Sequence, residues 1–204
     1  MIINSKQQLM FFLMADRMMN RGNFNRTIKD AIKELFLPDY TMRYLECMRK
    51  ANYYSHLEGK RKIIGSYYKL KQRKLGVKLG YSIANDVFGY GLVIPHYGTI
   101  VVGGGNQIGN YAVLHTSTCI TNGQKQIGDY LYVSTGAKLT TMETLGDGIT
   151  VAANSVVAKS IAESNVLLAG MPAGVKKYSV PWVDKSTHAD RVKKIEELKL
   201  KMKI

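Results

Sequence analysis

Residues 108–157 read IGNYAVLHTSTCITNGQKQIGDYLYVSTGAKLTTMETLGDGITVAANSVV and repeat an aliphatic residue every six positions. The repeated positions are Ile108, Leu114 and Ile120, then, after one extra residue, Ile127, Val133, Leu139, Leu145, Val151 and Val157. Upstream, Phe88, Ile94 and Ile100 keep this spacing, and the pattern places a two-residue insertion between Ile100 and Ile108. A small residue follows many of these positions.

A period of six fits neither the 3.6-residue period of an α-helix nor the two-residue period of a strand. It fits a coil with a triangular cross-section, in which each side holds six residues and turns its aliphatic residue inward. Small residues permit the tight corners. Eighteen residues then complete one turn, and stacked turns pair as parallel strands. The pattern predicts a mainly β, parallel β-helix over residues 81–180.

The two flanks have a different pattern. In residues 1–80 apolar residues recur at helical spacing, as in Ile28, Ile32, Leu35 and Phe36, with Asn25 or Thr27 as a candidate cap. A second basic helix is expected over residues 67–78. Residues 181–204 predict an amphipathic C-terminal helix capped by Ser186 or Thr187. We therefore expect a helical N-terminal subdomain (1–80), the β-helix (81–180) and a C-terminal helix (181–204).

Charge is concentrated in the flanks. The 204 residues carry a net charge of +14, of which residues 1–80 contribute +11 (17 Lys/Arg against 6 Asp/Glu), while residues 81–180 are neutral (5 against 5). A basic flank suits an anionic membrane surface or an anionic small molecule, or is simply solvated. No nucleic-acid motif accompanies it. The apolar run at residues 9–15 is too short to span a bilayer, and Cys47 and Cys119 fit no metal spacing. We expect a soluble, cytoplasmic protein that is at most peripheral to a membrane.

The sequence within the repeat resembles a known family. Residues 89–103, GYGLVIPHYGTIVVG, are similar to the catalytic stretch of the serine acetyltransferases, and residues 169–175, AGMPAGV, are similar to their closing motif. Asn52-Tyr-Tyr and residues 78–83, KLGYSI, resemble short relatives associated with surface polysaccharide synthesis. The resemblance identifies a hexapeptide-repeat acyltransferase with a left-handed β-helix.

This resemblance implies acetyl transfer from acetyl-CoA to a hydroxyl. A hydroxyl needs a base to remove its proton, and imidazole suits this because its pKa lies near working pH. His96 lies within the family motif and inherits that role. His115 follows one turn later, and because stacked strands are about 4.8 Å apart we expect it to lie beside His96. There it is expected to orient His96, to contact the acceptor, or only to occupy the surface. We expect His188 and His56 to be structural or surface residues, with His56 placed near the acceptor as an alternative.

Two departures from the family concern the acceptor. The family usually has Asp directly before the catalytic histidine, where this chain has Pro95. The family also has a second histidine after a longer loop, whereas the loop here is short and carries Gln124 instead. Both belong to the region that holds serine. The acceptor is therefore either L-serine or a sugar hydroxyl of a polysaccharide precursor.

The resemblance also implies where CoA binds, in the groove between neighbouring β-helices of a homotrimer, which two trimers could extend to a hexamer. The matching positions are Thr135, Ala153, Ala158, Lys159, Lys176 and Lys177, with Gly174 in place of a family Arg. The outer tyrosines Tyr111, Tyr130 and Tyr132 are expected to be exposed in a single copy and covered in the trimer. No metal is expected.

Two other functions stay open at this point. One is a non-catalytic β-helical scaffold or binding module. The other is a zinc-dependent carbonic anhydrase, which needs three converging histidines; His96 and His115 are nineteen residues apart, and the repeat contains no third histidine.

Overall fold

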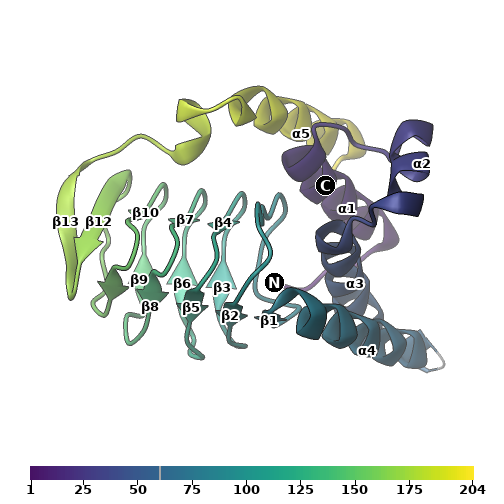
Figure 1. The fold of residues 1–204 in the computed structure, drawn as a ribbon, viewed down its shortest axis with the longest axis horizontal. Helices are drawn as coiled ribbons and strands as arrows, with labels where there is room; N and C mark the ends of the chain where they lie inside the picture. Colours follow the sequence, from purple (N-terminus) through teal and green to yellow (C-terminus); the bar gives the residue numbers. More distant parts are fainter. Residues whose placement is uncertain (60) are drawn as a thin grey trace.

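The computed structural model describes residues 1–59 and 61–204 and has two parts, a β-helix and a group of α-helices at one end of it (Figure 1). The helices are α1 (Lys6–Arg21), α2 (Ile28–Phe36), α3 (Tyr40–Ser55), α4 (Arg61–Leu79) and α5 (His188–Met202), with a 3-10 turn at Trp182–Lys185. The predicted arrangement of helices, β-helix and C-terminal helix is confirmed. No helix in the described part of the chain is long and apolar enough to cross a bilayer.

The β-helix has about five turns and three faces. The β1 face contains β1 (Tyr81–Ile83), β2 (Ile100–Val102), β5 (Thr118–Ile120), β8 (Lys138–Leu139) and β11 (Val156–Val157). The β3 face contains β3 (Gln107–Ile108), β6 (Gln126–Ile127) and β9 (Thr144–Leu145). The β4 face contains β4 (Val113–Leu114), β7 (Tyr132–Val133), β10 (Thr150–Val151), β12 (Val166–Gly170) and β13 (Ala173–Tyr178). All pairs are parallel except β12 with β13.

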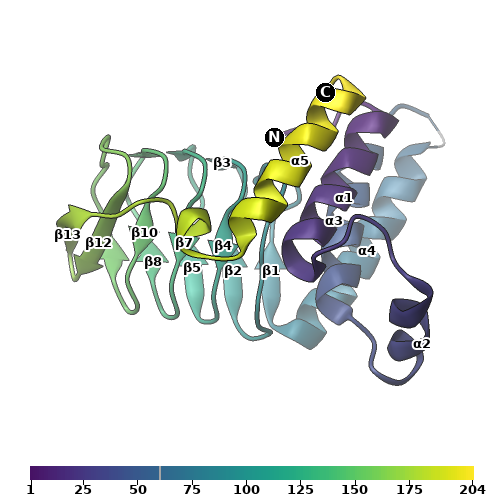
Figure 2. The same ribbon diagram turned by 90° about the horizontal axis from the view of Figure 1, so that it is seen from above.

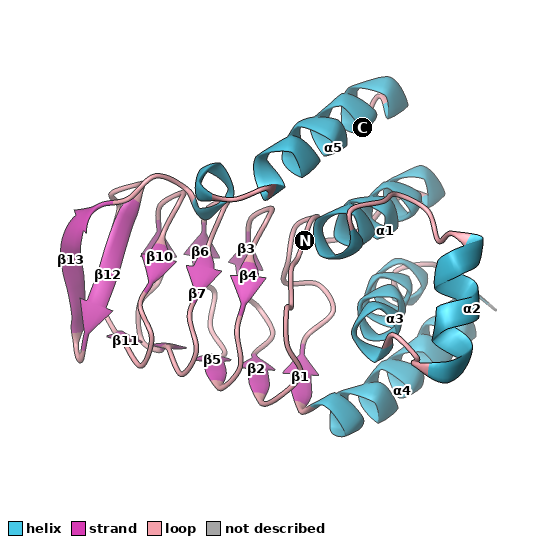
Figure 3. Ribbon diagram, turned by 45° about the horizontal axis from the view of Figure 1, so that its top comes forward, coloured by secondary structure: helices cyan, strands magenta, loops and turns pink. Residues whose placement is uncertain are grey.

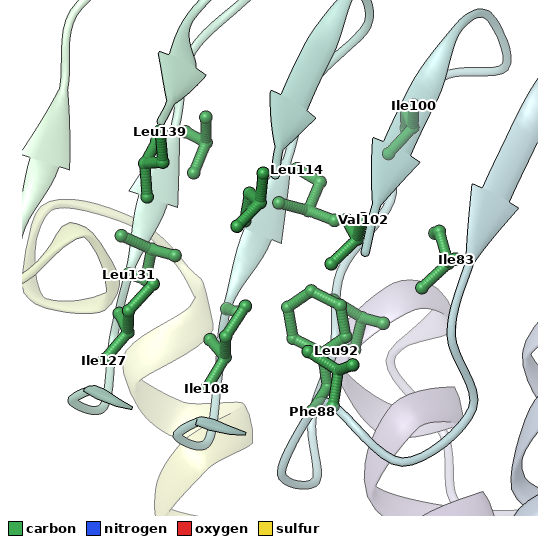
Figure 4. Close-up of a cluster of buried hydrophobic side chains, with 14 of the residues drawn as sticks. Ile83, Phe88, Leu92, Ile100, Val102, Ile108, Leu114, Ile127, Leu131 and Leu139 are labelled. Carbon is green, nitrogen blue, oxygen red and sulfur yellow. The ribbon is translucent and has the colours of Figure 1, made fainter. Parts of the chain in front are cut away.

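All twelve aliphatic or aromatic positions predicted from the repeat are buried in one core. Figure 4 shows part of this core, including Phe88, Ile108 and Leu114. The corners are tight because glycine stands where strands approach one another. A Cβ on Gly109, for example, would lie 2.7 Å from the backbone nitrogen of Asp129 in the next turn. The six-residue period therefore reports both the filled interior and the space available at the corners.

The predicted position of the upstream insertion is wrong. Ile100 pairs with Thr118, and Val102 pairs with Ile120, so Val102 continues the interior column. The two extra residues therefore lie between Ile94 and β2, in segment 95–99. This segment belongs to the connection between β1 and β2, which Figure 3 shows as a loop. Both Ile100 and Val102 are aliphatic and buried, so the pattern alone could not distinguish them.

The helical group has clear local signals. Ser5 caps α1, Asp39 caps α3, and Thr27 caps α2 in a capping box with Asp30, as the sequence predicts for Thr27. Helices α3 and α4 form a hairpin, and the predicted helix at residues 67–78 lies within α4.

The C-terminal segment runs back along the outside of the β-helix, and α5 packs on α1 of the same chain (Figure 2). Trp182 donates from Nε1 to the carbonyl of Tyr111 at 2.9 Å, and the Glu196 carboxylate accepts from the Tyr111 hydroxyl. Tyr111 is consequently 1% exposed, while Tyr130 and Tyr132 are half-buried. The expectation that these tyrosines are exposed in a single copy is wrong, because the chain covers them with its own C-terminus.

Candidate active site

His96 lies in the inserted segment, at the corner where the β4 face meets the β1 face. We call this corner the histidine edge; it comprises residues 95–99, 115–117, 134–137 and 152–155. The imidazole of His96 is exposed, whereas its backbone is held. The Tyr81 hydroxyl donates to the His96 carbonyl at 2.9 Å, and the Gly98 nitrogen donates to the carbonyl of Leu79. Gly98 has a backbone φ of +138°, which residues other than glycine rarely adopt, so this turn depends on glycine.

Helix α1 fixes the chain just before His96. Asn20 donates from Nδ2 to the Leu92 carbonyl at 2.8 Å and accepts from the Ile94 nitrogen at 3.3 Å. Asp16 accepts from the Leu92 nitrogen at 3.0 Å. These bonds replace strand pairing along one side of residues 92–94, so α1 determines where the segment leading to His96 lies.

A buried ion pair supports this contact. Arg49 of α3 and Asp16 are joined at 2.8 and 3.1 Å, and both side chains are almost wholly buried. Arg49 also donates to the carbonyls of Phe88 and Gly89 at 2.8 and 2.6 Å. A buried guanidinium is tolerated only when its donors are matched in this way. The pair ties two helices to the turn of the β-helix that precedes His96.

His115 lies beside His96, as predicted. The two ring centroids are 6.1 Å apart, and the ring of His115 also lies 5.1 Å from that of Tyr132. Burial, followed by repulsion from a charged His96, lowers the pKa of His115 below its ordinary value. His115 is therefore neutral at neutral pH and can accept a hydrogen bond or a proton there.

A pocket of about 560 Å³ opens beside His115. Its walls come from the end of α1, the β4 face and the C-terminal segment, and include Pro95, Tyr132, Trp182 and His188. The ring of Trp182 lies 6.3 Å from that of Tyr132 and 5.1 Å from that of His188. His188, which the sequence predicts to be a structural or surface residue, lines this pocket. No local sequence signal marks it, because the C-terminal segment must first fold back along the β-helix.

The charged side chains that line the pocket are cationic. Arg21 and Lys185 line it, and the described residues around it include no aspartate or glutamate. Arg21 is paired with Asp39 outside the pocket, at 2.5 and 2.8 Å. Burial lowers the pKa of His188, with the Arg191 guanidinium adding to the effect. The site thus offers aromatic surface and cations but no partner for an ammonium group.

The predicted CoA positions divide between two corners of the β-helix. Thr135 and Ala153 are exposed one turn apart on the histidine edge, in register with Thr116, the residue after His115, because β4 pairs with β7 and β7 with β10. Ala158 and exposed Lys159 follow β11, so they lie at the next corner, across the β1 face.

The remaining predicted residues lie elsewhere. Lys176 and Lys177 are exposed on β13, the antiparallel strand that closes the β4 face. His56 is exposed at the end of α3 and does not line the pocket beside His115. Gln124 lies in the loop between β5 and β6, at the same corner as Lys159. Within residues 1–59 and 61–204, no three His, Cys, Asp or Glu side chains are grouped to hold a metal ion.

The chain is similar in structure to solved serine acetyltransferases. The enzyme from Brucella abortus strain S19 aligns with a TM-score of 0.60 at 20% identity, over 86% of this chain and 69% of that one. The Neisseria gonorrhoeae enzyme aligns with a TM-score of 0.61 at 19% identity, over 90% and 72%, and has also been solved in complex with serine. A serine acetyltransferase in complex with CoA aligns at 0.59 and 18% identity, over 82% and 68%. No protein-family model and no curated protein matches the sequence. The protein thus has the fold of the serine acetyltransferases.

Proposed function

We propose that this protein is an acetyl-CoA-dependent O-acetyltransferase in which His96 is the general base. The observation that carries the proposal is an exposed imidazole on a fixed backbone, 6.1 Å from a second imidazole, on a β-helix with the fold of the serine acetyltransferases. The CoA bound by one of those structures supports acetyl-CoA as donor.

In this mechanism His96 accepts the proton of the acceptor hydroxyl as the hydroxyl oxygen bonds to the thioester carbon. When the carbon–sulfur bond breaks, the imidazolium returns the proton to the departing CoA sulfur. The Tyr81 hydroxyl keeps the His96 backbone in place through both steps. His115 is the second histidine of the site; as a neutral ring it can orient the acceptor hydroxyl or His96 without electrostatic cost. Thr135 and Ala153 would line the path of the pantetheine arm.

For the acceptor we propose a sugar hydroxyl rather than L-serine. The half-buried ring of Tyr132 and the edge of the more buried Trp182 line the pocket, and an aromatic ring is an apolar surface on which a sugar ring can pack. Within one copy, the described pocket wall offers no carboxylate to the ammonium of serine. Serine remains the second candidate, because the N. gonorrhoeae neighbour has been solved with it.

We further propose that the active form is a homotrimer, with two trimers as the alternative assembly. The division of the CoA positions supports this. One chain presents Thr135 and Ala153 on the histidine edge, while Ala158 and Lys159 lie at a different corner, so a groove between two copies could use both sets. Lys176 and Lys177 could meet the CoA phosphates as point charges.

The test is CoA thiol release from acetyl-CoA with L-serine, nucleotide-linked sugars and lipid-linked sugars as acceptors. His96→Gln should lower turnover by roughly 10² to 10⁴. His56→Gln is the matched control, because His56 is exposed at the end of α3, and it should leave turnover unchanged. Near-normal turnover in His96→Gln would remove His96 from its role. CoA binding without thiol release for any acceptor would favour the scaffold function instead.

A further inference from the structure

Helix α2 carries an apolar face that no other part of the described chain covers. Phe36 is 87% exposed and Leu35 78%, and the other large apolar residues of this segment are also exposed. None of the nine residues of α2 is buried. We call this surface the α2 face; it consists of Ile28, Ile32, Leu35, Phe36 and Leu37. Exposed apolar patches of this kind mark binding surfaces.

Polar contacts hold α2 in place from its opposite side. Asp30 pairs with Arg17 of α1 at 2.6 Å, and Glu34 pairs with Arg26 at 2.9 Å and with Arg43 of α3 at 3.5 Å. In helical projection these carboxylates lie opposite the apolar stripe. The helix is therefore oriented with its acids toward the protein and its apolar side chains toward solvent. Its capping box stabilises so short a helix without help from packing.

The charges beside the α2 face select the partner. Lys29 and Lys33 are exposed along one edge of the apolar stripe, whereas Asp30 and Glu34 are paired with arginines. The whole segment 1–80 carries a net charge of +11. In a two-fold contact between copies, each copy would bring the same lysines and only carboxylates that are already paired. An anionic lipid surface complements both the apolar stripe and the lysine edge.

We propose that the α2 face inserts into the interface of an anionic lipid bilayer, with Ile32, Leu35 and Phe36 as anchors and Lys29 and Lys33 contacting lipid headgroups. Figure 2 shows α2 projecting at the helical end of the molecule, away from the β12–β13 end. A second pocket lies beside it, lined by Lys33 and Leu37 as well as by Pro95 and Tyr97 of the His96 segment. Asp30 and Glu34 also line this pocket, so the His96 segment lies on the protein-facing side of α2, opposite the α2 face. The proposal does not depend on the acetyl-transfer chemistry.

The experiment is co-sedimentation of the full chain with vesicles of phosphatidylcholine alone or of phosphatidylcholine mixed with phosphatidylglycerol. The wild type should bind the mixed vesicles and bind phosphatidylcholine far more weakly, and added salt should weaken binding. The triple variant I32S/L35S/F36S should lower the affinity by roughly 100-fold. K29E/K33E should abolish the preference for the anionic vesicles. Because no residue of α2 is buried, the unfolding midpoint of both variants should match that of wild type.

Leu200→Ser is the matched control, since Leu200 is a leucine on another helix with 79% exposure, close to that of Leu35. It should bind the mixed vesicles as the wild type does. Wild-type and I32S/L35S/F36S proteins that bind equally would overturn the proposal. So would a wild type that ignores the vesicles but sediments as a larger species than the triple variant in the absence of lipid, because the α2 face would then hold a second copy of the chain.

Discussion

Removing the carboxylate of Asp16 should destabilise the protein far more than removing any surface acid. Asp16 neutralises Arg49, whose side chain is wholly buried, and also accepts from the Leu92 nitrogen at 3.0 Å. In Asp16→Ala the guanidinium keeps its bonds to two backbone carbonyls but loses its counter-charge in a site that water does not reach.

The structure gives the size of the effect. Breaking a buried ion pair by removing one partner costs about 3–5 kcal/mol. The unpaired Leu92 nitrogen adds about 1–3 kcal/mol, so Asp16→Ala should lose about 5 kcal/mol. Asp16→Asn retains an oxygen for Leu92 and should lose about 3 kcal/mol. With a urea dependence of about 2 kcal/mol per molar, the midpoints fall by about 2.5 M and about 1.5 M.

The assay is urea unfolding followed by circular dichroism. Glu46→Ala is the control, because Glu46 makes an exposed pair with Lys50 four residues later at 3.8 Å, and such pairs contribute less than about 1 kcal/mol. If Asp16→Ala fails to fold, Asp16→Asn still gives a midpoint. The reasoning is refuted if the midpoint of either Asp16 variant falls no further than that of Glu46→Ala.

Two further predictions follow from the same site. Asn20→Ala removes the hydrogen bonds to the carbonyl of Leu92 and the nitrogen of Ile94, which hold the segment leading to His96. In the acetyl-transfer assay kcat should fall roughly tenfold, while KM for acetyl-CoA changes little. A roughly tenfold rise in KM with unchanged kcat would argue against a positioning role for Asn20. The pKa values of His115 and His188 are lowered in the folded protein, so as pH falls the two histidines are protonated first in the unfolded chain, and stability should fall below about pH 6.5. Melting temperatures at about pH 7.5 and about pH 5.5 should therefore differ less in H115Q/H188Q than in wild type. An equal difference would show that these two histidines do not cause the loss of stability.

The interior of the β-helix was predictable because its signal is local and repeated. A period of six can arise from the interior of a three-sided coil, and twelve positions agree, so the core and its faces follow from the sequence. The same spacing predicts that His96 and His115 lie together, since they stand one turn apart. It could not place the insertion, because Ile100 and Val102 are both aliphatic and only the pairing of β2 with β5 shows which continues the column.

The supports of the site were not predictable, because each is a contact between distant segments. Asp16 and Arg49 are 33 residues apart and carry charges that a helical pattern assigns to solvent. Trp182 reaches Tyr111 across 71 residues, which makes the C-terminal segment a wall of the pocket. The expected exposure of Tyr111, Tyr130 and Tyr132 in a single copy is wrong for the same reason. A sequence pattern predicts that an apolar residue needs a partner, but it does not say whether that partner belongs to the same chain.

The position of the insertion explains why this β-helix needs helices beside its first turns. Segment 95–99 holds two residues more than the regular coil, so a loop carrying His96 there would be free to move if only the coil held it. Three contacts remove that freedom, from α1 through Asn20 before the loop, from Tyr81 at the His96 carbonyl, and from the β2 ladder after it. The contacts of Asn20 and Tyr81 depend on how α1 and β1 are placed against the segment that carries His96. Asp16 and Arg49 do not line the pocket beside His115. Substitutions at these two residues should therefore alter the His96 segment before they alter the β-helix core.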